Sequence, residues 1–547
     1  MLIKDKSNAI KQLKNNPLFE KEILNIISKI KNKQITQKQL MREKQILSKK
    51  FNLDFIIPNS LILEYNVNKD VFVNNFLIKK KIRTISGVAI IAVMIKPHKC
   101  PGKCIYCPNS NIAPKSYTGL EPATRRAIMF NFDPYLQVKN RLEQLNAIGH
   151  STEKIEIIIM GGTFLSLSKK YQINFVKNIF DSLNDKKSKN LDDAKKTNET
   201  AKHRCVGLTI ETRPDFCDKE QIKQMLYLGA TRVELGVQIL NNKIYKKTNR
   251  GHTIKDVAKA TELLKNSGLK ILYHIMPGLG TKKNDLDSFK LLFSDERFFP
   301  DMLKIYPVLV IEGTELHNLW KQKKYKALDI KKAVELICEF KKQVPEFVRI
   351  MRVQRDISKE KIIAGVDAGN LRELIEKQMQ KQYIKCRCIR CREAGHNIYK
   401  KNHKIHKNNI ELKYIKYIAS GSEEYFIYLI DKKQDILFGY LRLRILNKNC
   451  KIITKEITKN SAIIRELKVF GTSTPLGDNY DFSFQHRGFG KLLIKKAEEL
   501  TKKANKNKLL VMSAVGTKQY YEKFGFEKDG VYMSKIISQT KLIKVYG

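Results

Sequence analysis

The chain has 547 residues, with 104 Lys and Arg against 55 Asp and Glu, and its formal net charge is +49. This length predicts two to four domains and argues against a single small module. A charge of this size attracts phosphate backbones and therefore favours a nucleic-acid partner over an acidic one. The alternative is compositional, because abundant Lys, Asn and Ile are typical of an A+T-rich coding sequence.

The sequence contains no apolar stretch of about 18 residues, and residues 1–30 show no uninterrupted apolar core with a cleavage site. It therefore predicts neither a membrane span nor a signal peptide. Most of the ten cysteines lie in tight clusters or apolar runs, which is typical of metal ligands and buried thiols rather than of a disulfide framework. We expect a reducing compartment and a cytoplasmic protein.

Residues 1–80 are interpreted as a basic, helical N-terminal segment. Residues 1–50 contain 13 Lys or Arg against four Asp or Glu, and an amphipathic helical pattern runs from Leu18 to Ile30. Basic surfaces of this kind draw RNA in, and single-stranded loops are then recognised by stacking and polar contacts. A solvated basic face is the alternative interpretation.

Three cysteines, Cys100, Cys104 and Cys107, follow the apolar run Val88 to Ile95. Three thiolates in one short loop can hold three irons of a 4Fe-4S cluster and leave the fourth iron open to a ligand. The C-x3-C-x2-C spacing resembles that of the radical S-adenosylmethionine (SAM) enzymes, in which the open iron chelates SAM. The alternatives are a zinc knuckle, with His98 or a distant residue as fourth ligand, and three unrelated thiols.

Five further apolar segments follow this first predicted strand, with helical patterns between them, at residues 155–160, 206–210, 232–237, 270–275 and 302–308. Six strands that alternate with helices predict an α/β fold, a parallel (β/α)6 partial barrel within residues 81–370. The chemistry of such folds gathers at the carboxyl ends of the strands. The insert 181–203 is charged and low in complexity, and we expect it to be a disordered surface loop.

Glycines and polar residues follow the predicted strands. They are, in chain order, Gly161, Gly162, Glu211, Glu234, Gln238 and His274. The two glycines expose backbone groups that suit the amino group of SAM, and we include Glu211 in the same predicted site. Each residue alone is also explained as a turn or a satisfied polar group, whereas their recurrence on successive strands favours a common site.

A second cysteine group, Cys386, Cys388 and Cys391, lies in a linker that we place at residues 371–410. The C-x-C-x2-C spacing is too tight for most disulfides and suits zinc, which takes four N or S ligands. A barrel side chain is one candidate for the fourth ligand; the local candidates are His396, His403 and His406. A second cluster and free thiols remain the alternatives.

Residues 411–547 show a different pattern. A predicted strand at 463–470 is followed by Gln485, Gly488 and Gly490 in a Q-x-x-G-x-G loop, and then by a helical run at 491–505. A helix N-terminus after such a loop presents unpaired N–H groups to a pyrophosphate. With a further strand at 508–513 and the stretch Tyr520 to Phe526, the pattern resembles a GNAT α/β acetyltransferase domain, which implies acetyl-CoA as ligand.

The whole chain resembles the family of the Elongator catalytic subunit, the tRNA carboxymethyluridine synthase. The resemblance rests on the stretches PHKCPGKCIYCP, SYTGLEPATRRAI, HRCVGLTIETRPD, TRVELGVQ, AGNLRELI and VGTKQYYEKFGF. It implies that a SAM-derived radical abstracts hydrogen from the methyl group of acetyl-CoA, and that the resulting carbon radical adds to carbon 5 of the wobble uridine. Hydrolysis of the thioester then leaves carboxymethyluridine.

The same resemblance implies site residues and partners. The acetyl-CoA contacts would be Lys154, Glu466, Leu467, Lys468, Val469, Gln485, Gly488, Phe489, Gly490, Lys491 and Tyr521. Tyr520 or Tyr521 would act as an acid or orienting group near the thioester, with aromatic core packing as the alternative. The implied partners are the tRNA anticodon stem-loop and either a second copy of the chain or Elongator-type subunits. A protein lysine acetyltransferase that uses only the GNAT domain is the alternative function.

Overall fold

The computed structural model describes residues 9–395, 397, 409–470 and 488–538, except for residues 11, 69, 79–83 and 85. The chain divides into two compact units. One unit comprises the chain up to Ala89 together with Lys139–Glu153, and the other comprises Ile90–Val138 together with the chain from Lys154 onward.

The first unit contains a group of helices with its own apolar core. These helices are α2 (Pro17–Lys31), α3 (Gln37–Lys50), α4 (Asn59–Glu64) and α5 (Val71–Leu77). The Asn16 side chain caps α2 by accepting from the Leu18 and Phe19 N–H groups, and Thr36 forms a capping box with Gln39 at α3. The amphipathic helix expected from Leu18 to Ile30 is confirmed, and its apolar face joins a buried cluster drawn from all four helices.

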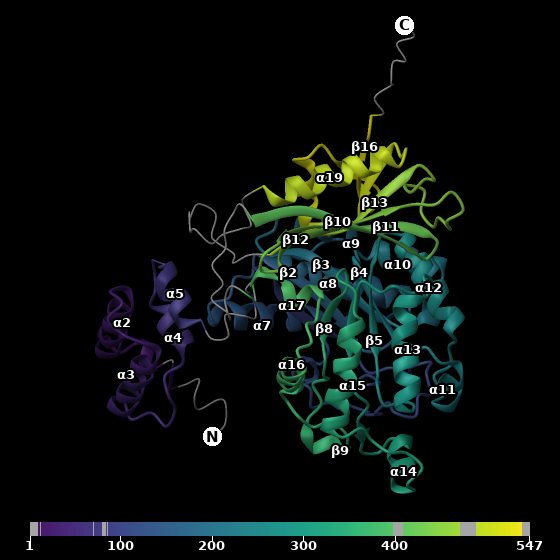
Figure 1. Cartoon of the computed structure of the whole chain (residues 1–547). Helices are drawn as coiled ribbons and strands as arrows, with labels where there is room; N and C mark the ends of the chain where they lie inside the picture. The colour runs from purple at the N-terminus through teal and green to yellow at the C-terminus, as the bar shows by residue number, and fades with distance from the viewer. Residues whose placement is uncertain are drawn as a thin grey trace. The chain divides into compact units, whose positions relative to one another are not determined.

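The second unit begins with a seven-stranded sheet in the order β1-β2-β3-β4-β5-β6-β8 (Figure 1), and every pairing from β2 to β8 is parallel. Its strands are β1 (Ala89–Met94), β2 (Lys154–Met160), β3 (Arg204–Thr212), β4 (Arg232–Gln238), β5 (Lys270–Ile275), β6 (Met302–Ile305) and β8 (Arg349–Arg352). The predicted partial barrel is therefore confirmed, with one strand more than expected. Strand β8 was not predicted, because its four residues, Arg-Ile-Met-Arg, contain no apolar run.

Helices connect the parallel strands, as this topology requires. They are α6 (Pro122–Met129), α7 (Pro134–Ala147), α8 (Lys169–Asn184), α9 (Leu191–Asn198), α10 (Lys219–Tyr227), α11 (Asn242–Lys247), α12 (Ile254–Asn266), α13 (Lys282–Ser294), α14 (Glu315–Lys321) and α15 (Ile330–Gln343). Side-chain caps at Ser168, Asp218 and Thr253 begin α8, α10 and α12. A small pair, β7 (Val310–Ile311) and β9 (Ile362–Ala364), precedes α16 (Leu371–Lys381) and α17 (Ile389–Arg392).

The expectation of a disordered loop at residues 181–203 is wrong. Helix α8 extends to Asn184, and α9 occupies Leu191–Asn198 with Leu191 and Ala194 buried. Asn198 is also fully buried, where its side chain accepts from the Cys205 N–H and donates to the Asn184 side chain. A few apolar contacts and specific amide hydrogen bonds order the insert, and composition alone does not reveal them.

The C-terminal part forms a second seven-stranded sheet in the order β10-β11-β12-β13-β14-β16-β15. Its elements are β10 (Ile410–Ala419), β11 (Ser422–Asp431), β12 (Ile436–Ile445), β13 (Ser461–Val469), α19 (Phe489–Lys503), β14 (Lys508–Val511), α20 (Lys518–Glu522), β15 (Glu527–Asp529) and β16 (Tyr532–Ile536). Strands β13 and β14 are parallel, but they pair only at residues 461–464 and 508–511. Beyond Ile464 the two strands separate.

The second sheet packs against the amino ends of the barrel strands through buried charges. Arg465 of β13 binds both Asp301 oxygens, at 2.8 and 2.6 Å, and reaches Glu424 of β11 at 3.0 Å. Arg444 of β12 donates to the Asn266 side chain at 2.6 Å. Because Asp301 immediately precedes β6 and Asn266 ends α12, these contacts join the C-terminal sheet to the amino end of the barrel.

Candidate active sites at the two ends of the barrel

The cysteine loop lies at the carboxyl end of β1, where the topology places catalytic residues. Cys104 is buried, and its Sγ accepts from Arg250 Nη1 at 3.4 Å. Cys100 Sγ lies 3.9 Å from Thr163 Oγ1, and Cys107 Sγ lies 3.2 Å from Ser116 Oγ. The loop thus places each thiol beside a hydroxyl or guanidinium group, and three thiolates in one such loop suit a cluster.

Positive charge surrounds the buried thiol. A hydrogen bond with Cys107, together with Arg250 and Arg213, lowers the pKa of Cys104 to about 4 even though burial opposes this shift. A thiolate is the form that binds iron. Burial, together with the same two arginines, lowers the pKa of His252 to about 2, so this imidazole stays neutral near the cluster loop.

Gly161 and Gly162, the glycine pair predicted to expose backbone groups to SAM, both have positive φ angles. Gly161 and Gly162 have φ of 136° and 87°, in the region that favours glycine. A Cβ at Gly161 would lie 2.3 Å from Ile95 Cγ1, so no side chain fits there. The pair directly precedes Thr163, which contacts Cys100, and its backbone therefore lies beside the cysteine loop.

Charged residues line the barrel interior behind the loop. The Tyr117 hydroxyl donates to Glu211 at 3.0 Å, and Glu211, Glu234 and His274 place one ligand atom each within 4.8 Å of one another. Glu234 also pairs with His274 at 2.8 Å and with Lys304. Burial raises the pKa of Glu234, but Lys304 and then His274 outweigh it, so that the carboxyl remains ionised.

The second cysteine group is also assembled by the fold. The Sγ atoms of Cys386, Cys388 and Cys391 all lie within 4.8 Å of one another. Helix α17 holds this turn between the two sheets, because the Ile389 N–H donates to Val348 O beside β8 and Glu393 forms a backbone bridge with Leu437 of β12. Three converging thiols suit a tetrahedral zinc site. His396, His403 and His406 lie outside the described residues.

The acetyl-CoA residues expected on β13 lie where this strand leaves β14. Residues Glu466 to Val469 still pair with β12, from Arg442 to Gly439, but their other edge has no β14 partner. Backbone groups on such an edge can pair with the amides of an extended ligand. The Glu466 side chain is held by Arg442 Nε at 2.9 Å, so we expect this residue to contact a ligand through its backbone.

Helix α19 and the tyrosine pair border the same opening. Gly488 begins the helix with φ of 77° and provides no side-chain cap, which leaves the first-turn N–H groups for an anion. A Cβ on Gly490 would lie 2.0 Å from the Tyr520 hydroxyl and 4.0 Å from Leu467, so these three residues meet. Tyr521 is buried against Phe526. Gln485 lies outside the described residues.

The two groups of residues lie at opposite ends of the barrel. The cysteine loop follows the carboxyl end of β1, whereas Lys154 begins β2 at the amino end, on which the second sheet packs. Strand β3 spans nine residues, so at about 3.3 Å per residue the two ends are roughly 25 Å apart. Among the described residues, Cys100 and Thr163, which follows the predicted SAM-binding glycines, are in contact at one end of the barrel, whereas Leu467, Gly490 and Tyr520 meet at the other end.

Family models match three parts of the chain. The Radical SAM superfamily matches residues 94–292, the Radical_SAM C-terminal domain matches 300–381, and the acetyltransferase (GNAT) domain matches 481–535. A radical SAM domain implies a 4Fe-4S cluster with SAM, and a GNAT domain implies acetyl-CoA.

Relatives cover nearly the whole chain. A tRNA uridine(34) acetyltransferase from Methanocaldococcus infernus is 49% identical over 87% of this chain and 91% of its own length. Elongator complex protein 3 from Homo sapiens is 42% identical over 84% of this chain and 86% of its own. The chain belongs to the Elongator complex protein 3 family. The solved structure of the archaeal Methanocaldococcus infernus Elp3, with an N-terminal deletion, matches this Elongator family member with a TM-score of 0.75, at 46% identity over 83% of this chain and 100% of that one.

Sequence reasoning missed several residues of this Elongator family site. Arg250 and His252 follow α11, far from the cysteines in sequence, yet both lie at the cluster loop. The available signal was weak: an Arg-Gly-His turn directly before the predicted helix at 253–266. Lys304, which faces Glu234 from β6, was hidden in an apolar strand.

Among the described residues, no helix is long and apolar enough to cross a bilayer.

Proposed function

We propose that the protein modifies carbon 5 of the wobble uridine of tRNA with the use of SAM and acetyl-CoA, as a tRNA carboxymethyluridine synthase. One observation carries the proposal. A single compact unit holds a three-cysteine loop at one end of a parallel barrel and, at the other end, the opening where β13 separates from β14. Relatives named tRNA uridine(34) acetyltransferase support tRNA as the substrate.

Cys100, Cys104 and Cys107 would hold the cluster. When bound, a 4Fe-4S cluster supplies the electron for reductive cleavage of SAM. The Cys107 hydrogen bond and Arg250, which donates to Cys104, favour the ionised thiol, while Gly161 and Gly162 let backbone groups approach the SAM amino group.

At the other end, α19 and β13 would hold acetyl-CoA. The uncapped first turn of α19 would bind the pyrophosphate, and the unpaired edge of Glu466 to Val469 would bind the pantetheine amides. Lys154, Phe489 and Lys491 would supply further contacts. Tyr520, whose hydroxyl reaches Gly490, and Tyr521 would orient or protonate the thioester group.

Cys386, Cys388 and Cys391 would hold a structural zinc ion. The three thiols converge in the linker, where Glu393 pairs with Arg349 of the barrel and bridges Leu437 of the C-terminal sheet, so the metal would stabilise this junction. We expect about one zinc per chain in protein prepared without the iron-sulfur cluster. Elemental analysis that finds none would favour free thiols.

The basic helices of the first unit would dock the tRNA, and the modified base would enter at the cysteine loop. A second copy of the chain or Elongator-type subunits would complete the assembly. The ten cysteines, which the structure leaves as free thiols, fit a cytoplasmic location.

The test is to measure acetyl-CoA hydrolysis by anaerobically reconstituted full-length protein with and without tRNA. We expect tRNA to trigger hydrolysis, and nucleoside mass spectrometry to show loss of the modified uridine in a deletion strain. Equal hydrolysis without tRNA, together with efficient acetylation of a lysine peptide, would instead support a protein acetyltransferase.

A further inference from the structure

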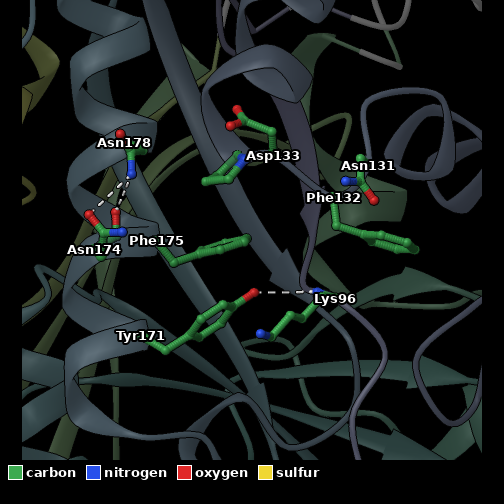
Figure 2. Close-up of a pocket in the computed structure, with 9 residues that line it drawn as sticks. Lys96, Asn131, Phe132, Asp133, Tyr171, Asn174, Phe175 and Asn178 are labelled. Atoms are coloured by element: carbon green, nitrogen blue, oxygen red, sulfur yellow. Dashed lines mark hydrogen bonds between the residues drawn. The ribbon is translucent and has the colours of Figure 1, made fainter.

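A small pocket opens on the outer rim of the barrel beside the end of β1. It has a volume of about 230 Å³ and is lined by residues from three segments: Lys96, the turn before α7, and one face of α8 (Figure 2). Sites for drug-sized ligands measure roughly 300–1,000 Å³, so this pocket is too small for SAM or acetyl-CoA. Its size fits one planar ring.

Aromatic side chains form two walls of the pocket. Tyr171 and Phe175 extend from α8 with ring centroids 5.7 Å apart, and Phe132 belongs to the facing turn (Figure 2). The Lys96 N–H donates to the Tyr171 hydroxyl at 3.3 Å, and the Lys96 ammonium lies 5.2 Å from the Tyr171 ring. The pocket therefore combines flat apolar surfaces with one positive charge.

The facing turn has an unusual backbone. Asn131 and Phe132 both adopt left-handed conformations, with φ of 47° and 59°. A bulky residue rarely takes this conformation, and it persists only where the surroundings impose it. Hydrogen bonds from the Phe132 and Asp133 N–H groups to Ala127 O and Phe130 O hold the turn. Phe132 also packs against the Met94 cluster, so its ring is fixed before any ligand binds.

The pocket adjoins the cluster loop and its charge. Lys96 is four residues before Cys100, and α8 begins soon after Gly161 and Gly162. Five exposed lysines lie on these segments: Lys96, Lys99, Lys103, Lys169 and Lys170. A polyanion that reaches the cysteine loop therefore has a basic path past the pocket.

We propose that this pocket binds one nucleobase of the RNA substrate, from a nucleotide that flanks the target uridine. The base would stack on the aromatic walls, and Lys96 would contact its phosphate. Asn131 and Asn174 would offer amide donors and acceptors to the base edge. The inference rests on the proposed function, because it takes RNA as the substrate.

The first experiment measures binding of an anticodon stem-loop RNA to the full-length, cluster-loaded protein. We expect Tyr171→Ala to weaken binding by roughly tenfold, as removal of one stacking platform does. Tyr227→Ala is the matched control, because Tyr227 on α10 is also partly buried and also lies under a lysine, Lys195, at 4.5 Å. Both variants should keep wild-type iron content and wild-type SAM cleavage without RNA.

The second experiment removes the base instead of the side chain. Stem-loops with one abasic sugar at each loop position are bound to wild-type protein and to Tyr171→Ala. At one flanking position, we expect loss of the base to weaken binding to wild type about as much as Tyr171→Ala weakens binding of the intact RNA. Binding of that abasic RNA to Tyr171→Ala should then be no weaker than either single change makes it. Crosslinks from 4-thiouridine at that position should map to residues 131–134 or 171–178.

The outcomes separate this inference from the proposed function. The pocket proposal fails, and the proposed function stands, if wild type and Tyr171→Ala bind the stem-loop equally well. It also fails if the losses in affinity from Tyr171→Ala and from base removal multiply at every loop position. If cluster-loaded wild type does not bind the stem-loop at all, both proposals fail. Crosslinks from 4-thiouridine that map outside residues 131–134 and 171–178 at every loop position would also overturn the nucleobase assignment.

Discussion

Arg250 connects the cysteine loop to the fourth barrel strand. Its Nη1 donates to Cys104 Sγ, and its Nη2 donates to the Gly236 carbonyl. This guanidinium is buried, and the neighbouring thiol and carbonyl satisfy part of its hydrogen-bonding capacity. At the residue scale, the loop is therefore positioned by a charge from a distant turn as well as by its own glycine and prolines.

Replacement of one thiol tests the loop. Wild type should hold about four irons per chain, and we expect Cys104→Ser to lose most of this iron because one of three thiolates is removed. The visible absorption of the cluster should be lost with it. Iron analysis after anaerobic reconstitution makes the measurement. Cys338→Ser is the control, since Cys338 is also buried but lies on α15. SAM cleavage by Cys104→Ser at the wild-type rate would contradict the assignment.

The tyrosine pair gives a second prediction at this scale. Tyr520→Phe removes only the hydroxyl that reaches Gly490, so we expect tRNA-dependent acetyl-CoA hydrolysis to fall by about 10² while tRNA binding is kept. Tyr521→Phe should have a smaller effect, because that ring is buried against Phe526. Tyr414→Phe, on exposed β10, serves as control. Equal rates for Tyr520→Phe and wild type would assign this phenol to packing.

At the scale of elements, the contact between α12, β6 and the C-terminal sheet depends on buried charge. Asp301 and Glu424 face Lys265, Arg442, Arg444 and Arg465, and all six side chains are fully buried. Arg465 is well paired, whereas the Lys265 ammonium lies 3.7 Å from Asp301 and 3.5 Å from Glu424 without a hydrogen bond. Burial lowers the pKa of Lys265 to about 8.

Two substitutions separate these roles. Asp301→Asn removes the bidentate carboxylate partner of Arg465 and leaves Glu424 as the one acidic group facing Lys265 and three buried arginines, so it should lower the free energy of unfolding by about 3–5 kcal/mol. Lys265→Met removes a poorly paired ammonium and should be neutral or stabilising by about 1–2 kcal/mol at pH 7. Denaturant unfolding of the second unit makes the measurement. If Lys265→Met instead lowers the free energy of unfolding by several kcal/mol, the lysine is well paired in the folded protein.

The pH dependence follows from the same lysine. Its pKa in the folded protein lies below the unfolded value of about 10.4. Between about pH 8 and 10 the unfolded chain therefore binds more protons, and this residue favours the folded state increasingly as pH rises. The stability advantage of Lys265→Met over wild type should shrink across that interval, and an advantage that grows with pH would contradict the assignment.

At the scale of the whole molecule, the first unit adds a basic surface to the enzyme. Lys21, Lys38 and Lys49 are exposed on α2 and α3, on the side of these helices opposite their buried core. The solved archaeal relative lacks its own residues 1–46, so that protein folds without them. We predict that these lysines contribute to the docking of RNA.

A triple variant tests this division. Changing Lys21, Lys38 and Lys49 to Gln should weaken tRNA binding and reduce the slope of log affinity against log salt by about 0.7–0.9 for each phosphate that these lysines neutralise. Iron content and SAM cleavage should not change. Lys255, Lys259 and Lys331, exposed on α12 and α15, give the matched control triple. An unchanged salt slope would show that these three lysines neutralise no phosphates.

The sequence by itself determined the features that depend on short spacing. Three cysteines within eight residues define the cluster loop, and the capped, amphipathic helices and apolar strands follow from local periodicity. The tyrosine pair and the glycine at the start of α19 were likewise readable, because the GNAT pattern is contiguous along the chain.

Only the tertiary structure decided which distant residues meet. The order in residues 181–203 depends on the Asn198 amide and its partners, and composition does not encode such contacts. Arg250 reaches Cys104 across 146 residues, and the C-terminal sheet meets the amino end of the barrel through Arg465 and Asp301. These contacts arise from the packing of separate elements, and no local period in the sequence reports them. The separation of the two sites by the length of the barrel follows from the same packing.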